Sequence, residues 1–243
     1  MYAFESRIRY SETDSGGKLS PEGLLNYFQD CSTFHSEDLG LGVNYLKEQS
    51  MAWVLSSWQI SVSRYPELGE KVTVGTFPYE FKGYFGYRNF CMKDENGTYL
   101  ARANSLWTLL DIRSMYPTKP TPLMLERYVL EEKLDMEYAS RKITLPRDGR
   151  AEAAVKVHAR HLDTNHHVNN VQFVRIAMDC LPDGFQISQL RAEYKKQAFL
   201  HEVLYPVVAA EDGGFAVSLQ DADGGIYVNV EFQESGKEKE CLG

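Results

Sequence analysis

HARHLDTNHHVNNVQFVRIAMDC, residues 158–180, aligns without a gap on RYSETDSGGKLSPEGLLNYFQDC, residues 9–31. Asp14 meets Asp163, and the Asp-Cys pair that ends the first stretch meets the pair that ends the second. In each stretch a residue type that caps helices, Ser20 or Asn169, precedes an apolar run of helical spacing. Because strand, cap and helix occur in the same order twice, the alignment predicts an internal repeat.

The residues around the first stretch predict a short strand, a helix and then four long strands. Residues 4–10 alternate between apolar and polar, as a strand does. Ser20 and Pro21 open a helix, and Gly40 is a plausible stop. The apolar stripe of that helix and the strand-like runs that follow it are Leu24, Leu25, Phe28 and Cys31, and then residues 51–64, 70–79, 84–93 and 98–112. Asn96-Gly97 between the last two runs is a strong hairpin signal.

The second half repeats this order. The sequence predicts a strand over residues 155–160 and a helix over 169–181, which Pro182 stops. Strand-like runs follow at residues 186–194, 202–210, 215–219 and 226–232. Between the halves, residues 114–152 contain four prolines and no strand alternation, which is typical of a linker with one short helix.

A long helix wrapped by a curved antiparallel sheet, present twice, is the tandem hotdog arrangement of the α+β class. We therefore predict an N-terminal hotdog over residues 1–113, a linker over 114–152 and a C-terminal hotdog over 153–243. Hotdog folds usually pair side by side, so this chain would form its own internal pseudo-dimer. The sequence leaves open whether two chains also form a homodimer.

The composition is that of a globular protein. Of 243 residues, 43% are hydrophobic and 25% are charged. No apolar run approaches the roughly 20 residues of a membrane helix, and the N-terminus lacks the features of a secretory signal. We therefore expect a cytoplasmic protein that binds no membrane. The net charge of −8 argues against broad binding to nucleic acid. The four cysteines have no metal-ligand spacing, so we expect no metal and no cofactor.

Asp163, Asn165 and His167 form the main cluster of reactive side chains. In an extended segment alternate residues project to one side, and a carboxylate, an amide and an imidazole would then converge. These groups can activate water and polarise a carbonyl. His166 would point away and serve packing or the surface. The alternative interpretation of the cluster is a polar turn beside a helix cap.

The helix that begins at Asn169 and Asn170 supplies unpaired backbone N–H groups and a positive dipole end. Such groups could stabilise an oxyanion directly beside the cluster. The first half has Gly16 and Lys18 where the alignment places Asn165 and His167. We therefore expect only the second half to be catalytic.

Several further motifs occur in a familiar order. They are Asn26-Tyr27-Phe28-Gln29-Asp30, His35, Trp53-Val54-Leu55, Arg64-Tyr65-Pro66, Gly69-Glu70, Ser105-Leu106-Trp107, residues 163–170 and Glu193-Tyr194-Lys195-Lys196. With these motifs the chain resembles the acyl-acyl-carrier-protein thioesterases of plants and bacteria over nearly its full length. The resemblance implies an enzyme that hydrolyses fatty acyl-acyl carrier protein, releases the free fatty acid and so ends chain elongation.

The resemblance places the family's catalytic Asp, Asn and His on Asp163, Asn165 and His167. The family's Glu-Cys pair falls on Gln197 and Ala198, which is a departure. Ala198 cannot be a nucleophile. Gln197 can hold a water molecule but cannot take its proton. The general base must therefore be His167, Asp163 or another group.

The resemblance also implies an acyl-chain tunnel in the first half and a docking surface for acyl carrier protein. Candidate tunnel residues are Phe28, Trp53, Trp58 and Trp107, and ordinary core packing is the alternative for each. An acidic carrier protein requires a local basic surface. The candidates are Lys195 and Lys196, or a second group that consists of Arg141, Lys142, Arg147, Arg150, Lys156 and Arg160.

Three other functions remain open at this point. Acyl-CoA hydrolysis is the same chemistry on a different carrier. A hotdog dehydratase pairs a histidine with a carboxylate across a subunit interface, whereas Asp163, Asn165 and His167 cluster locally. A non-catalytic acyl-binding protein would explain the missing Glu, but the intact Asp-Asn-His set argues against it.

Overall fold

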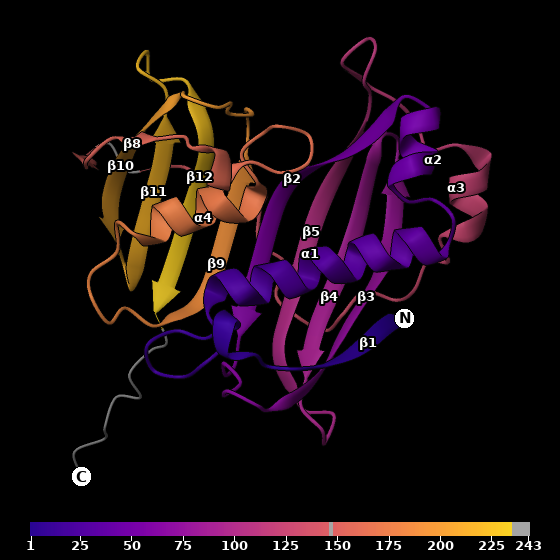
Figure 1. Ribbon diagram of the computed structural model, residues 1–243, viewed down its shortest axis with the longest axis horizontal. Helices are drawn as coiled ribbons and strands as arrows, with labels where there is room; N and C mark the ends of the chain where they lie inside the picture. Colours follow the sequence, from indigo (N-terminus) through magenta and orange to yellow (C-terminus); the bar gives the residue numbers. More distant parts are fainter. Residues whose placement is uncertain (146–147, 235–243) are drawn as a thin grey trace. The chain divides into compact units, whose positions relative to one another are not determined.

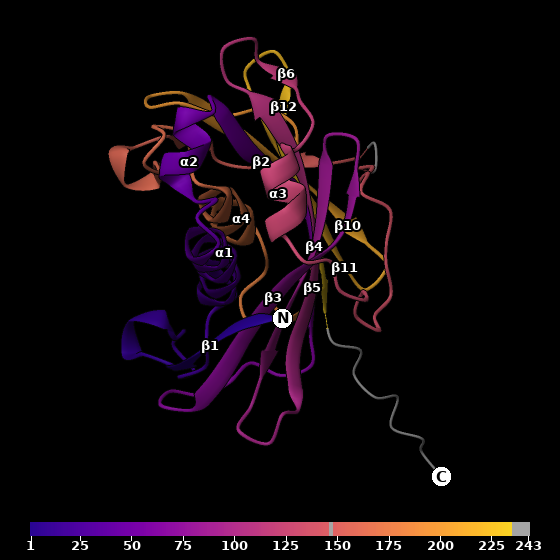
Figure 2. The ribbon, with the colours of Figure 1, turned by 90° about the vertical axis from the view of Figure 1, so that its right-hand side faces the viewer.

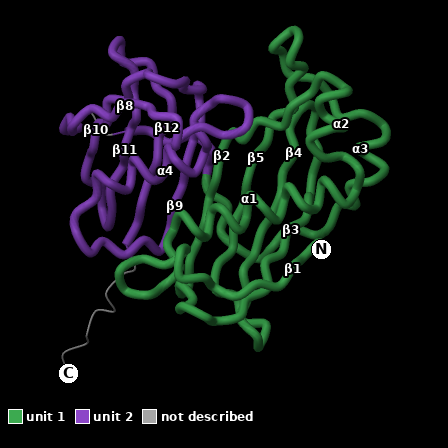
Figure 3. The backbone as a smooth tube through the Cα atoms, in the orientation of Figure 1, with its two compact units in different colours: residues 1–139 green, residues 140–243 purple. Residues whose placement is uncertain are grey.

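The computed structural model describes residues 1–145 and 148–234. The chain divides into two compact units, Met1–Ala139 and Ser140–Gly243 (Figure 3). The division falls inside the segment that the sequence predicted as a linker. The earlier part of that segment belongs to unit 1, because Met124 and Tyr128 are buried in one cluster with Leu41 and Leu109.

Unit 1 is a helix on an antiparallel sheet. Its strands lie in the order β1-β3-β4-β5-β2, and β6 pairs with β5. Helix α1 runs across the strands in Figure 1 and lies on one side of them in Figure 2. The elements are β1 (Tyr2–Arg7), η1 (Tyr10–Glu12), α1 (Pro21–Asp38), α2 (Val43–Glu48), β2 (Met51–Val62), β3 (Lys71–Lys82), β4 (Phe85–Lys93), β5 (Tyr99–Asp111), β6 (Tyr116–Pro117) and α3 (Pro122–Arg127).

The signals at the ends of α1 work as the sequence predicted. The side chain of Ser20 accepts a hydrogen bond from the backbone N–H of Gly23 at 3.0 Å, and Pro21 is the first helical residue. Gly40 follows the helix in the left-handed region, with a φ of 65°. The predicted stripe is buried, and Phe28 packs against Trp58 and Phe90 with ring centroids 6.3 and 5.5 Å away.

Unit 2 repeats the arrangement with a shorter helix. Its strands lie in the order β9-β12-β11-β10-β7, and β8 pairs with β10. Helix α4 packs on β11 and β12. The elements are β7 (Arg150–Ala151), β8 (Val155–Lys156), η2 (Ala159–His161), α4 (Asn170–Met178), β9 (Ile187–Tyr194), β10 (Val203–Glu211), β11 (Gly214–Gln220) and β12 (Ile226–Glu234).

One expected strand was wrong, and one short helix was not predicted. The strand predicted over residues 155–160 is only β8, since residues Ala159–His161 turn into a 3-10 helix. The short helix α2 was not predicted, because its six residues provide too little apolar periodicity to be recognised. Neither difference alters the order of the main elements, which place the same type of loop before the helix in each unit.

Candidate active site

The loop that carries Asp163, Asn165 and His167 is a tight turn and not an extended segment. The N–H of Asp163 donates to the carbonyl of His167 at 2.8 Å, and the N–H of His166 donates to the carbonyl of Asp163 at 3.1 Å. The Asp163 carboxylate accepts from the N–H of Asn165 at 2.8 Å and from that of His167 at 3.3 Å. The premise that the segment is extended was therefore wrong, and the turn instead brings the backbone of Asn165 and His167 to the Asp163 carboxylate.

Unit 1 contains the same turn at Asp14. The N–H of Asp14 donates to the carbonyl of Lys18, and the N–H of Gly17 donates to the carbonyl of Asp14. The Asp14 carboxylate accepts from the N–H of Gly16 at 2.9 Å and from that of Lys18 at 3.1 Å. These four bonds correspond one by one to those of Asp163. The repeat predicted from the sequence is thus present at the level of individual hydrogen bonds.

Two hairpins use the same turn, at Asp94 and Asp221. In all three of these other turns the residue three positions after the aspartate is a glycine with φ between 75° and 82°, namely Gly17, Gly97 and Gly224. In the candidate site that residue is His166, with a φ of 62°. A side chain in this region is strained, and such strain gathers at functional sites. His166 therefore sets this turn apart from its three counterparts.

The ring of His167 packs edge-on against Phe199, with centroids 5.0 Å apart. His167 is half-buried, whereas Asn165 is exposed. Within residues 1–145 and 148–234, the structure records no hydrogen bond between the Asp163 carboxylate and the His167 ring. The Asp163 carboxylate is instead bound to the backbone of its own turn.

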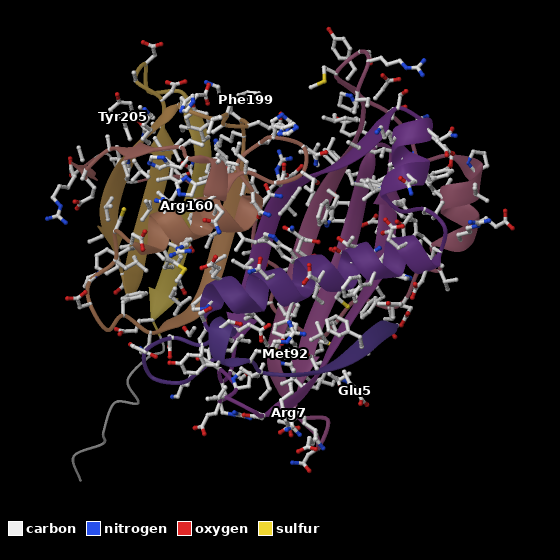
Figure 4. The ribbon with its side chains drawn as sticks, viewed as in Figure 1. Glu5, Arg7, Met92, Arg160, Phe199 and Tyr205 are labelled. Carbon is white, nitrogen blue, oxygen red and sulfur yellow. The ribbon has the colours of Figure 1, made fainter. Side chains whose placement is uncertain are left out.

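A second segment lies directly against this loop. The N–H of Val168 donates to the carbonyl of Ala198 at 2.9 Å. Ala198 is fully buried, while its neighbours Gln197 and Phe199 are exposed. Phe199 is labelled in Figure 4. The structure thus brings the backbone beside Gln197 to the loop.

The N-terminus of α4 is largely occupied by its own cap. The side chain of Asn169 accepts from the N–H of Val171 at 2.8 Å, and the carbonyl of Asn169 accepts from Gln172 and Phe173. In the described part of the chain, the N–H of Asn170 is the first-turn donor for which no acceptor is recorded. Of the two predicted asparagines, Asn169 is a helix cap and Asn170 retains a backbone donor.

Two residues near the site were not predicted from the sequence. The buried hydroxyl of Tyr194 donates to the carbonyl of Asn170 at 3.0 Å, and burial raises its pKa. The N–H of Asn169 donates to the carbonyl of buried His161, whose pKa is lowered by burial and by nearby cations. Both fix the start of α4. Tyr194 could have been found from the motif at residues 193–196, in which it occurs. His161 could not, because the capping pattern of the helix does not point to it.

The thiols are placed for packing. Burial raises the pKa of Cys31 to about 12 and that of Cys180 to about 11, so both are protonated at neutral pH. Cys91 is also buried, and Cys241 lies outside the described residues. Among the described residues, no group of three or more His, Cys, Asp or Glu side chains could hold a metal ion.

The predicted tunnel residues fall into two classes. Phe28 and Trp58 are buried and pack on each other, with ring centroids 6.3 Å apart. Trp53 and Trp107 are half-buried. Trp53 packs against Phe81, and the indole N–H of Trp107 donates to the hydroxyl of Ser105 at 2.8 Å.

The two lysines predicted to dock a partner already have carboxylate neighbours. Lys195 lies 3.4 Å from Glu193, and Lys196 lies 2.8 Å from Asp221. The Lys196–Asp221 pair lies at the surface, where ion pairs are weak, whereas the Glu193 side chain that Lys195 contacts is only 11% exposed. In the alternative basic group, Arg147 lies outside the described residues, and Arg160 is labelled in Figure 4.

The chain matches two family models along most of its length. The acyl-ACP thioesterase N-terminal domain matches residues 1–127, and the acyl-ACP thioesterase C-terminal domain matches residues 146–232. A chloroplastic acyl-[acyl-carrier-protein] hydrolase of Cuphea viscosissima is 26% identical over 85% of this chain and 54% of its own length. A chloroplastic palmitoyl-acyl carrier protein thioesterase of Gossypium hirsutum is 26% identical over 84% of this chain and 54% of its own. The chain thus spans about half the length of these curated relatives.

Solved structures show the same fold. An acyl-ACP thioesterase from Bacteroides thetaiotaomicron has a TM-score of 0.88 at 21% identity, covering 96% of this chain and 97% of that one. The 12:0-ACP thioesterase from Umbellularia californica has a TM-score of 0.84 at 20% identity, covering 96% of both chains. The predicted α+β class with two tandem hotdog folds is confirmed. No helix among the described residues is long and apolar enough to cross a membrane.

Proposed function

This chain belongs to the acyl-ACP thioesterase family, and we propose that it hydrolyses the thioester of fatty acyl-acyl carrier protein to a free fatty acid and the carrier thiol. The resemblance found in the sequence is confirmed by family models that match both halves. The observation that carries the proposal is the turn at Asp163, which holds Asn165 and His167 beside the start of α4. By ending chain elongation, the reaction would belong to fatty acid synthesis, and we place it in the cytoplasm.

His167 is proposed as the general base. It removes a proton from water as the water oxygen attacks the thioester carbonyl carbon. The carbonyl oxygen becomes negatively charged, and the backbone N–H of Asn170 and the amide of Asn165 are the donors proposed for it. The intermediate then expels the carrier sulfur, which receives the proton from His167. One water is consumed, the thioester carbon–sulfur bond breaks, and acid and thiol result.

Asp163 is proposed as a positioning residue. Its carboxylate accepts two backbone N–H groups of the turn, and its twin Asp14 does the same where the chain has no histidine or asparagine. This use of the carboxylate supports a role in holding the loop rather than in raising the basicity of the His167 ring. Gln197, exposed beside buried Ala198, is proposed to bind the attacking water through its amide.

Acyl carrier protein is the proposed partner, with Lys195 and Lys196 as its docking cations. Unit 1 is proposed to receive the acyl chain, because its turn lacks the reactive side chains. Pairing of the two hotdog folds as a pseudo-dimer, and of two chains as a homodimer, belongs to the same proposal.

Hydrolysis rates on carrier-protein and CoA thioesters of the same acyl chain test the proposal. Purified protein should release thiol from a graded series of acyl-acyl carrier proteins, and the His167→Ala variant should not. Higher activity on acyl-CoA would assign the alternative carrier. Binding of acyl-acyl carrier protein without any hydrolysis would favour the non-catalytic acyl-binding function.

A further inference from the structure

Arg88 places a positive charge inside unit 1. The residue lies on β4 and is 8% exposed. Its Nη1 donates to the hydroxyl of Thr76 at 3.2 Å and lies 3.0 Å from Nδ1 of His35 on α1. The guanidinium carbon lies 5.5 Å from the ring centre of Tyr128. A tyrosine ring, a hydroxyl and an imidazole therefore surround the charge, and all three can be neutral.

Arg88 has no carboxylate partner. Within residues 1–145 and 148–234, the structure records no ion pair for Arg88 and no acceptor for its Nε or Nη2. Neither Nε nor Nη2 is completely enclosed by protein, so a ligand atom can reach both. Arg191 of unit 2, by contrast, is paired with Glu231 at 2.8 Å. A buried cation with no counter-ion is strongly disfavoured unless another group completes its surroundings.

The neighbouring titratable groups do not supply the missing negative charge. The pKa of His35 is lowered to about 4 by burial and by Arg88, so this ring is neutral at pH 7. Burial raises the pKa of Cys31 to about 12, which keeps its thiol protonated. Neither His35 nor Cys31 therefore supplies a negative charge to the guanidinium.

The register of the sheet places Arg88 among the predicted tunnel residues. Arg88 on β4 lies opposite Ser105 on β5, and Ser105 lies opposite Trp58 on β2. Directly paired residues share one face of a sheet. Phe90, two residues on, shares that face and packs against Phe28 of α1. The charge thus lies on the helix-covered face, in line with the residues proposed to receive the acyl chain.

We propose that Arg88 binds an oxygen atom carried along the acyl chain, so that the protein prefers acyl chains with a keto, hydroxyl or terminal carboxylate group. The proposal rests on the proposed function, because it assigns a substrate class to the acyl chain that unit 1 is proposed to receive. An acceptor oxygen would complete the hydrogen bonds of Nε and Nη2, and bonds to a charged donor are the stronger kind. A fully aliphatic chain has no acceptor and would leave Nε and Nη2 of Arg88 without a hydrogen bond.

Kinetics on acyl chains of one length test the substrate class. One substrate is unsubstituted, and the others carry a keto group or a hydroxyl at successive carbons, or a terminal carboxylate. The wild-type protein should favour at least one oxygenated chain in kcat/KM by about tenfold or more. Comparison among the keto, hydroxyl and carboxylate substrates shows which of the three groups Arg88 binds. Equal kcat/KM for every chain would overturn the proposal.

Arg88→Met should remove this preference, measured as the ratio of kcat/KM between the oxygenated and the unsubstituted chain in the same protein. The matched control is Arg102→Met, since Arg102 also lies on the sheet but stacks over Tyr99 on the opposite face. Arg102→Met should keep the preference. Thermal melts show whether each variant is folded. If Arg88→Met does not fold, Arg88→Lys replaces it, because a lysine keeps the charge but not the fork and should reduce the preference.

Binding of inert analogues separates failure of this proposal from failure of the hydrolase function. S-alkyl thioethers of pantetheine, with and without the chain oxygen, can be titrated by calorimetry into both proteins. Tighter binding of the oxygenated thioether to the wild type but not to Arg88→Met would support the site even if no thioester were hydrolysed. Hydrolysis with equal binding of both thioethers would reject the site and leave the hydrolase function intact.

Discussion

Asp14 and Asp163 occupy equivalent turns of the two units, and each carboxylate accepts the N–H groups of the residues two and four positions later. The turn at Asp14 has no reactive side chain, because Gly16 and Lys18 stand in place of Asn165 and His167. The shared hydrogen bonds therefore serve the shape of the turn, whichever side chains it displays.

The first prediction separates the structural and chemical roles of Asp163. An asparagine retains an oxygen that accepts the two N–H groups, so Asp163→Asn should keep activity within about tenfold, with an unchanged pH profile. Asp163→Ala should lower kcat by about a hundredfold, because His167 is then misplaced. Asp14→Asn and Asp14→Ala are the matched controls and should affect only the melting temperature. An Asp163→Asn variant as inactive as the alanine variant would show that the charge itself is needed.

The second prediction concerns the reactive side chains of the loop. His167→Ala and Asn165→Ala should each lower kcat by about a hundredfold or more, the usual scale for loss of a general base or an oxyanion donor. His166→Gly should keep activity, because the other three turns have glycine at this left-handed position. It should also relieve strain of up to about 1 kcal/mol. Steady-state rates and melts check both, and greater sensitivity at His166 would reverse the assignment.

The third prediction restores the family's carboxylate. Gln197 is exposed, so Gln197→Glu adds a charge at little cost in stability. A carboxylate beside the water can share the task of His167 and ordinarily stays ionised well below neutral pH. The variant should keep or raise kcat and retain activity at lower pH than the wild type. A stable variant that is much slower, with a pH profile of unchanged shape, would contradict a role for this position in water activation.

The fourth prediction tests the docking cations. Lys195→Glu with Lys196→Glu should raise KM for carrier-protein substrates several-fold and leave KM for small thioesters nearly unchanged, because charge acts mainly on encounter. Lys71→Glu is the control, since Lys71 is an exposed lysine of unit 1 paired with Glu95 at 3.0 Å. The salt dependence of KM should weaken in the double variant only. The same change on both substrate types would move the docking surface elsewhere.

The fifth prediction is a dependence of stability on pH that arises from His35. The folded protein holds the pKa of His35 at about 4, below its ordinary 6.5, through burial and Arg88. Between these values the unfolded chain binds the proton more readily, so stability falls as pH drops from 6.5 toward 4. His35→Gln lacks this proton and should lose fewer degrees of melting temperature over that range. Parallel curves for the two proteins would show that His35 is not the titrating group.

Much of the fold follows from local signals in the sequence. Ser20 and Pro21 set the start of α1, and Asn96-Gly97 sets the hairpin between β4 and β5. The long strands are evident because each alternates over many residues. These features depend only on neighbours in sequence, and so they were predicted with nearly the right bounds.

The residues of the candidate site were proposed from the sequence, but the conformation of their loop was predicted wrongly. Asp14, Asp94 and Asp221 are each followed three residues later by a glycine, and this spacing indicates a turn. Asp163 lacks the signal because His166 stands at the glycine position. Arg88 could be assigned to a strand face, but its lack of a counter-ion could not be predicted. Its neighbours His35, Thr76 and Tyr128 come from distant parts of the sequence, and only the folded unit brings them together.

The turn at Asp14 in unit 1 offers a place to rebuild the reactive loop, because it has the same hydrogen bonds and none of the reactive side chains. Its four turn hydrogen bonds match those of the reactive loop, and a Cβ atom added at Gly16 would lie 3.3 Å from the carboxylate of Asp14. Gly16→Asn with Lys18→His would therefore place an asparagine and a histidine at the positions equivalent to Asn165 and His167, with the main chain of the turn unchanged. The activity of the exchanged loop would measure how much of the chemistry resides in these two side chains and how much requires Asn170 and Gln197 of unit 2.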